Sequence, residues 1–435
     1  MKFFATTSAK SRLMYMHLFL LLLTTQLHAQ YNNQADTVTV SLQQAEKIFI
    51  DSNLSILAAH YNVDAASAQV MQAKYWDNPV LNTDQVISAN HQFLPYKTLP
   101  DGSPGAQYFI QIQQLIKTAG KRGKLIAAAQ INVNISSLQL QDVIRKLRSQ
   151  LHIDYYTITK NYSSYIFYTQ QQNQLNTLIA AMKAELDAGN ISQKDFLQLQ
   201  ALSVSLQQDE NDVINSTNDA EADVKTLLHF SANAFVKPDS ASIPAFTLNN
   251  NVDFFISQAK ENNPYYKLQI EQTIYQQQML TYQKALRVPD VTVTPNFDRQ
   301  SNYAPDYYGI GVSVPLPLFN KNKGNIASAS YAVQQQQTIQ SNAENEMEND
   351  VANAYNKLSL AITQNNTVNK DFFKRYNALY QNMFNSYKAR QISLLEFIGF
   401  FNDYKDLQEK LLQQQLNLLL AADNLNYETG IDVIK

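Results

Sequence analysis

The chain contains one segment twice, and this tandem duplication constrains its fold more than any other feature. Asn53, Lys74 and Pro79 recur 210 residues later, and farther along the chain the offset is 201. The later matches pair Gly123 with Gly324, Ile191 with Ile392, Ser192 with Ser393, and Phe196 with Phe397. The difference in offset falls between Pro79 and Gly123, in a predicted hairpin loop where a change of length costs little. We therefore expect two similar structural units.

The duplication also sets the domain boundaries. Residues 30–230 form the first repeat, with a helix, a β-hairpin at about 80–116, a long helix and a returning helix. Residues 231–251 are a linker. Residues 252–435 form the second repeat, with the same order of elements and its hairpin at about 290–316.

The first 29 residues have the layout of a secretory signal peptide. Lys2, Lys10 and Arg12 precede a short apolar run, and Ala29 offers a small residue for cleavage. The run is much shorter than the ~20 residues that span a bilayer, which disfavours a transmembrane anchor. The chain has no cysteine, so disulfides and an acylated N-terminal cysteine are excluded. Loss of three cations takes the net charge from −3 to about −6, and a mildly acidic protein is not suited to coating nucleic acid.

Long helices dominate the rest of the chain. Neither proline nor glycine occurs between Gly123 and Gly189, and a helix of that length measures ~100 Å. After Pro317 no further proline occurs, so we expect a second long helix. Apolar residues in the first helix follow the spacing of a coiled-coil seam. They are Leu140, Val143, Leu147, Leu151, Leu175, Leu178, Ile179, Met182 and Leu186.

The remaining helices are about half as long. The first helix of each repeat covers about 41–75 and 252–285, and the returning helices cover about 192–229 and 393–425. Two half-length helices stacked end to end therefore cover one long helix.

Strand-like segments of about ten residues lie between the helices. The first repeat offers 80–90 and a returning strand from Tyr108, and in the second repeat apolar and polar residues alternate more clearly. This length and period are typical of transmembrane β-strands. Four strands cannot close a barrel, because the smallest membrane barrels use about eight and lipid does not tolerate open edges. Three copies would give a twelve-stranded barrel; the alternative is a soluble hairpin domain.

Tyr75 and Trp76 stand where the first helix enters the first hairpin. An aromatic pair at this position fits a membrane-interface girdle and a packed core equally well.

No catalytic or metal-binding pattern is apparent. His60, His91, His152 and His229 are scattered without ligand spacing. The adjacent carboxylates Asp209 and Glu210 point in different directions on a helix, and we interpret them as a solvated face. The sequence therefore disfavours an enzyme and predicts no cofactor.

Several motifs follow one another in a defined order: the repeated helix phrase at 45–53 and 259–264, the entry to the long helix at 120–123, the turn at 188–192, and the matching stretches at 314–324 and 389–397. Their order and spacing resemble those of the TolC-like outer-membrane efflux proteins over nearly the whole chain. The resemblance implies a homotrimer that is mainly α-helical, with a coiled-coil tunnel across the periplasm and a twelve-stranded β-barrel in outer-membrane lipid. It also implies a periplasmic adaptor protein and an inner-membrane pump, of the proton-driven resistance-nodulation-division type.

By the same resemblance, the two helix turns are the periplasmic tips that contact the adaptor. The predicted contact residues are Gly189, Asn190, Ile191, Ser192, Asp195 and Phe196 in the first repeat, and Gln391, Ile392, Ser393, Leu394, Glu396 and Phe397 in the second. Independently of the family, Ser192 suits a helix cap and Gly189 a left-handed closure, so a role in capping and packing alone is the alternative. Arg390 stands where the family usually has glycine, which favours a different closure of the second tip.

The stretch 315–324 resembles the branch of the family that serves heavy-metal pumps, which favours metal ions over other small molecules as cargo. A secreted coiled-coil scaffold or adaptor without a channel is the alternative function. It would not need detergent for solubility.

Overall fold

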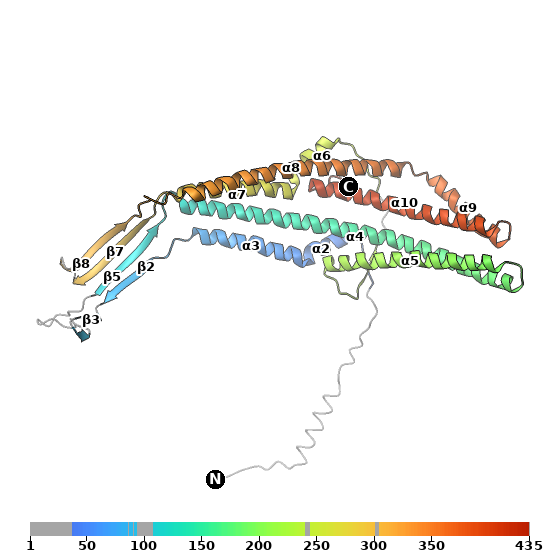
Figure 1. The fold of residues 1–435 in the computed structure, drawn as a ribbon, viewed down its shortest axis with the longest axis horizontal. Helices are drawn as coiled ribbons and strands as arrows, with labels where there is room; N and C mark the ends of the chain where they lie inside the picture. The colour runs from blue at the N-terminus through green and yellow to red at the C-terminus, as the bar shows by residue number, and fades with distance from the viewer. Residues whose placement is uncertain are drawn as a thin grey trace, which may run out of the picture.

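The longest element, α4 (Lys121–Asp187), runs through the centre of the molecule in the computed structural model (Figure 1). The structure describes residues 37–85, 87–89, 91–93, 108–239, 244–300 and 304–434, so the predicted signal peptide lies outside the described residues. At ~1.5 Å per residue, the 67 residues of α4 span ~100 Å. A β-sheet lies at one end of this length and two helix turns lie at the other (Figure 1).

Half-length helices line α4 on both sides, as expected. On one side, α3 (Leu54–Lys74) covers the half near the sheet and α5 (Gln193–Leu228) covers the half near the turns (Figure 1). On the other side, α7 (Pro264–Ala285) and α10 (Leu394–Thr429) do the same. The α8 helix (Lys323–Asn366) packs against α7 and α10 at the edge of this arrangement.

An asparagine interrupts the first helix of each repeat, where we expected one continuous helix. Asn53 separates α2 (Leu42–Ser52) from α3, and Asn263 separates α6 (Val252–Asn262) from α7. The Asn53 side chain accepts hydrogen bonds from the backbone of the new helix, and its amide donates to the Leu227 carbonyl over 2.9 Å. Asn263 donates to the Glu428 carbonyl over 2.9 Å in the same way. Each break thus joins two helices end to end.

The second long helix is also interrupted, contrary to the expectation from its lack of proline. After α8 the chain leaves the helix at Thr367 and re-enters it as α9 (Lys370–Lys388), with Asn369 as the N-cap. The Asn369 side chain accepts from the Phe372 amide over 3.0 Å. Asparagine and threonine have modest helix propensity and favour capping, so the polar run at 365–369 can break a helix without proline or glycine.

Four antiparallel strands form the sheet, in the order β2-β5-β7-β8. They are β2 (Val80–Gln85), β5 (Tyr108–Ile116), β7 (Val291–Gln300) and β8 (Pro305–Ser313). The strand expected at 80–90 ends at Gln85, and a separate short hairpin of β3 (Ser88–Ala89) and β4 (Gln92–Phe93) follows it. Among the residues that the structure describes, β2 and β8 are the edge strands of this sheet, so each has one side free for pairing.

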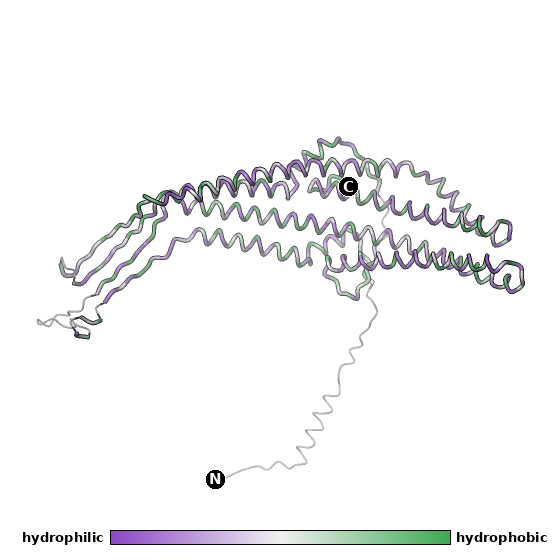
Figure 2. The backbone as a smooth tube through the Cα atoms, in the orientation of Figure 1, coloured by the Kyte–Doolittle hydropathy of each residue, from purple (hydrophilic) through white to green (hydrophobic). Residues whose placement is uncertain are grey.

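A small parallel pair lies near the middle of the molecule. It joins β1 (Thr37–Val40) to β6 (Phe235–Pro238), so the segment 231–251, which we expected to be only a linker, contains a strand. Near this pair, Leu151 is fully buried, and near the turns Leu175 and Leu178 are 1% exposed, as the seam predicts. Hydrophobic and hydrophilic residues alternate along the backbone (Figure 2). None of the helices among the described residues is both long enough and hydrophobic enough to cross a membrane.

Candidate functional site

The two faces of the sheet differ in chemistry. The strand register places one set of apolar side chains on a common face: Leu81, Ile110, Ile112, Val293, Pro295, Phe297, Tyr308, Ile310 and Val312. Ile310 and Val312 are 77% and 65% exposed. The opposite face is largely polar or small, with Asn82, Gln111, Gln113, Thr292, Thr294, Asn296, Gly309, Gly311 and Ser313. Such a sheet can face lipid on one side and water on the other.

The aromatic pair at the base of the sheet is exposed. Tyr75 is 67% and Trp76 is 62% exposed, which excludes a packed core within one chain. The Arg122 guanidinium lies 4.6 Å from the centre of the Trp76 ring, a cation–π contact.

At the other end, both helix turns close with the same hydrogen bonds. In the first turn Gly189 has a φ of 76° and the Asn190 amide donates to the Glu185 carbonyl over 2.8 Å. In the second, Arg390 has a φ of 60° and the Gln391 amide donates to the Ser386 carbonyl over 2.8 Å. The different closure that we expected from Arg390 is therefore wrong. An L-residue can adopt this left-handed conformation at a cost of ~1–2 kcal/mol.

The N-caps of the returning helices are also alike. Ser192 accepts from the Asp195 amide over 3.0 Å, and Ser393 accepts from the Glu396 amide over 3.2 Å. These capping contacts follow from the sequence pattern and need no partner protein.

The twelve predicted contact residues divide by exposure. Phe196, Leu394 and Phe397 are buried in the apolar cluster between the two hairpins, and they support the tips from within. Ile191, Asp195 and Ile392 are partly buried. The others are exposed: Gly189, Asn190, Ser192, Gln391, Ser393 and Glu396.

A groove brings residues of both tips together. The cavity has a volume of about 400 Å³ and is lined by Ile191 and Asp195 from the first tip and by Ile392, Ser393 and Leu394 from the second. Arg390 also lines it, and its guanidinium pairs with Glu185 of the first tip. The hydrogen bond from Asn190 and the Arg390 charge hold the pKa of Glu185 below its usual value. The two tips thus form one continuous surface.

Ion pairs above the tips join the two helical hairpins. Lys405 of α10 contacts Asp209 of α5 over 2.6 Å, and Lys160 of α4 contacts Glu409 of α10 over 2.8 Å. Glu210 accepts from Thr169 over 2.8 Å. Asp209 and Glu210 therefore point to different partners, as expected, but their interpretation as a solvated face is wrong because both bind neighbouring helices.

A cluster of charged residues at mid-length was not predicted. The His152 ring lies between two carboxylates, with Nδ1 contacting Asp423 and Nε2 contacting Glu46 over 2.7 Å. Arg148 also contacts Glu46, over 2.6 Å, and makes two 2.9 Å bonds to Asp432. The partners are 102 to 284 residues apart in the chain, so no local pattern could reveal them.

Close packing of opposite charges shifts two pKa values in this cluster. Burial would lower the pKa of His152, but the bonds to Asp423 and Glu46 outweigh it and raise the pKa to about 9. The bond to His152, helped by Arg148, outweighs burial and lowers the pKa of Glu46 to about 2. Because both ring nitrogens contact carboxylates, His152 serves as a cation rather than a metal ligand. Among the described residues no group with metal-binding geometry occurs.

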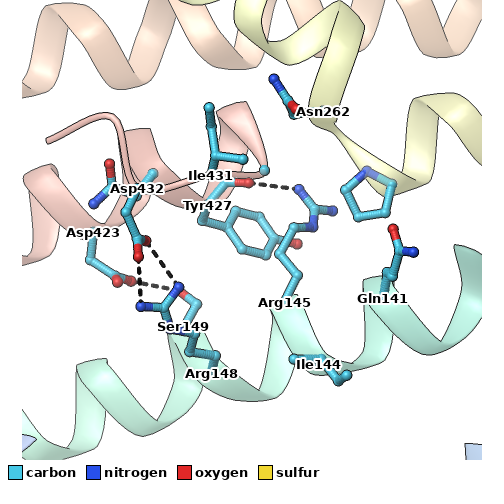
Figure 3. A pocket seen from close by; sticks show the side chains of 13 residues that line it. Gln141, Ile144, Arg145, Arg148, Ser149, Asn262, Asp423, Tyr427, Ile431 and Asp432 are labelled. Carbon is cyan, nitrogen blue, oxygen red and sulfur yellow. Dashed lines mark hydrogen bonds and ion pairs between the residues drawn. The ribbon is translucent and has the colours of Figure 1, made fainter. Parts of the chain in front are cut away.

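A cavity of about 230 Å³ adjoins this cluster (Figure 3). The Arg145 guanidinium lies 4.0 Å from the centre of the Tyr427 ring and donates to the Tyr427 carbonyl over 2.8 Å. Arg148 and Asp432 both line it and form an ion pair with one another (Figure 3). These cations are thus matched by acceptors from α10 and the C-terminal segment, and the cluster joins the first repeat to the second.

Comparisons with known proteins agree with this architecture. The family model for the outer membrane efflux protein matches residues 48–228. The cobalt-zinc-cadmium resistance protein CzcC of Cupriavidus metallidurans is 21% identical over 295 residues, which cover 67% of this chain and 66% of CzcC, just under two thirds of its length.

Solved structures match over more of the chain. A structure of CusC matches with a TM-score of 0.73 and 14% identity, covering 92% of this chain and 94% of that one. The outer-membrane channel OprN matches with a TM-score of 0.74 and 12% identity, covering 93% and 96%. The outer membrane protein VceC of Vibrio cholerae matches with a TM-score of 0.70 and 14% identity, covering 89% and 96%. At these identities the structural matches establish the fold.

Proposed function

Because residues 48–228 match the family model for the outer membrane efflux protein, we propose that three copies of the chain form the exit channel of a tripartite efflux system. The observation that carries this proposal is the four-stranded sheet, which has an apolar face, a polar face and two free edges. In lipid, each unpaired backbone group costs several kcal/mol, so β8 of one copy must pair with β2 of the next. Three copies close a barrel of twelve strands.

The helices extend this barrel as a tunnel through the periplasm. A single copy supplies α3 and α5 at one edge of the helical layer and α8 at the other (Figure 1). When the sheets join edge to edge, these helices meet those of the next copy and close a ring. The length of α4, ~100 Å, sets the reach of the tunnel away from the membrane.

The tips bind the periplasmic adaptor in this proposal. Asn190, Gln391 and Glu396 are exposed, and each is next in sequence to a residue that lines the groove. The groove combines partly buried apolar side chains with capped helix starts, and a helical hairpin of the adaptor could contact both. Phe196, Leu394 and Phe397 act by holding the two turns in place, since they are buried.

We further propose that the pump is of the proton-driven resistance-nodulation-division type and that the cargo includes divalent metal ions. The support for the cargo is the relative CzcC, which is by name a cobalt-zinc-cadmium resistance protein. The pump type rests on the resemblance of the sequence to the TolC-like proteins. The channel needs no metal site for this role, because in this proposal the pump selects the cargo and the channel only conducts it.

Growth on metal salts tests the export function. Cells that lack this chain should become sensitive to cobalt, zinc or cadmium, and the wild-type gene should restore resistance. Normal growth of the deletion strain on these metals and on a panel of toxic small molecules would contradict an export role.

A photo-crosslinking residue at Gln391 tests the adaptor contact, with Tyr61 as the control site because it is 62% exposed on α3, far from the tips. The tip residue should capture an adaptor protein that mass spectrometry identifies, and the control should not. Capture of the adaptor only from Tyr61 would place the interface elsewhere.

A further inference from the structure

A segment next to each free edge of the sheet exposes large apolar side chains. After β8, the linker 314–322 carries Leu316, Leu318 and Phe319, which are 73%, 67% and 98% exposed. Before β2, the linker 75–79 begins with the exposed Tyr75 and Trp76, and Val80 at the start of the strand is 53% exposed. Leaving so much apolar surface in contact with water is unfavourable, so a partner is expected to cover it.

The equivalent linkers inside the chain are already joined to one another. The linker between β5 and α4 packs on the linker between α7 and β7, where β5 and β7 pair as neighbours. Thr118 donates to the Pro289 carbonyl over 2.6 Å and its amide donates to Asp290 over 2.8 Å. Lys121, the first residue of α4, is 3% exposed and contacts the Val288 carbonyl over 2.6 Å and Asp290 over 2.7 Å.

The duplication relates this internal junction to the two free linkers. The linker after β8 corresponds to the linker after β5, since Gly120 and Asn322 are the N-caps of the following long helices and both have a left-handed backbone conformation. The linker before β2 corresponds to the linker before β7, since Pro79 and Pro289 are 210 residues apart. In the assembly, β8 ends beside the start of β2 of the next copy, because the two strands run antiparallel.

We propose that the linker 314–322 of one copy packs on the linker 75–79 and Val80 of the next copy, forming an apolar clasp between subunits at the base of the barrel. Val80 stands at the position that Asp290 occupies in the other repeat, so the ion pair of the internal junction has no counterpart here. Phe319 and its neighbouring leucines supply apolar contact instead. Counted from the two N-caps rather than from the 201-residue sequence offset, Lys323 at the start of α8 is equivalent to Lys121 at the start of α4. Lys323 is exposed in one chain and would lie near the Asn78 carbonyl of the next copy.

The clasp rests on the proposed trimer and predicts which side chains meet within it. Because the chain has no native cysteine, Phe319→Cys combined with Val80→Cys introduces a unique pair of thiols. A short bis-maleimide added to the detergent-solubilised trimer should convert the double variant into species of two and three chains on a denaturing gel. Either single variant should stay a single chain. So should Phe319→Cys combined with Leu395→Cys, because Leu395 is 79% exposed at the opposite end of the molecule.

Fluorescence gives a second measurement, since Trp76 is the only tryptophan. In the trimer, Phe319→Ala should shift the Trp76 emission to longer wavelength, whereas Tyr331→Ala, at a side chain 70% exposed on α8, should leave it unchanged. A trimeric mass without cross-linking, together with quenching of Trp76 by brominated phospholipid, would assign the apolar linkers to lipid and overturn the clasp. A wild-type protein whose mass is not that of three chains would instead contradict the proposed function.

Discussion

Replacing His152 by glutamine should destabilise the protein in a pH-dependent manner. The side chain of His152 is 10% exposed, and its pKa rises from 6.5 to about 9 in the folded protein. At ~1.4 kcal/mol per pKa unit, this shift corresponds to about 3 kcal/mol of stability. Since the folded pKa is the higher one, the contribution is complete below pH 6.5 and is lost as pH rises through about 9.

Thermal unfolding of the detergent-solubilised protein, followed by circular dichroism, measures this effect. With ~2.1 cal/mol/K of unfolding entropy per residue, a chain of 435 residues changes its Tm by ~3 °C for about 3 kcal/mol. The wild-type protein should lose roughly this much Tm between pH 6 and pH 9.5, and His152→Gln should show the lower Tm already at pH 6. His60→Gln, at an exposed position on α3, should behave as the wild type. A wild-type Tm that is independent of pH across this range would refute the reasoning.

Three further substitutions test the breaks and the turns by the same melting assay. Asn53→Ala removes both the cap of α3 and the donor to the buried Leu227 carbonyl, and should destabilise the protein by ~2–4 kcal/mol. The control Asn342→Ala, at an exposed position, should have little effect. Equal Tm values for the two variants would contradict the role of Asn53 in joining α2 to α3. Gly189→Ala should destabilise the protein by ~1 kcal/mol, because the φ of Gly189 is 76°. The control Gly123→Ala, in a helix with open space around it, should be neutral or stabilising. The reverse order of stability would contradict the left-handed conformation at the first helix turn. Arg390→Gly should leave the Tm nearly unchanged, because relief of the left-handed conformation offsets the lost pair with Glu185, and a fall of many degrees would show that this pair holds the tips together.

The periodic spacing of apolar residues in the sequence predicted the strands of the second hairpin and the buried face of the long helix. The alternation at 291–297 and 310–314 gave the strands of the second hairpin, and the spacing of Leu151, Leu175 and Leu178 gave the buried seam of α4. The break at Asn263 carried a signal that was missed, because Pro264 disfavours a helical conformation in the residue before it. Asn53 repeats the break without proline and could be inferred only by comparing the two copies.

Features that depend on distant contacts could not be predicted in this way. The carboxylates around His152 come from α2 and α10, and neither helix carries a local pattern that points to α4. The closure at Arg390 shows the same limit. A family preference for glycine indicated a different turn, but the backbone hydrogen bonds at 385–391 fix the geometry, and the long side chain of Arg390 reaches Glu185 in the other tip.

The mass of the mature protein extracted from outer membranes in detergent, corrected for bound detergent, tests the central claim most directly. A mass of three chains is expected, because the two free edges of the sheet can be paired only by other copies. A single chain that stays soluble without detergent would contradict the channel and favour a secreted coiled-coil scaffold.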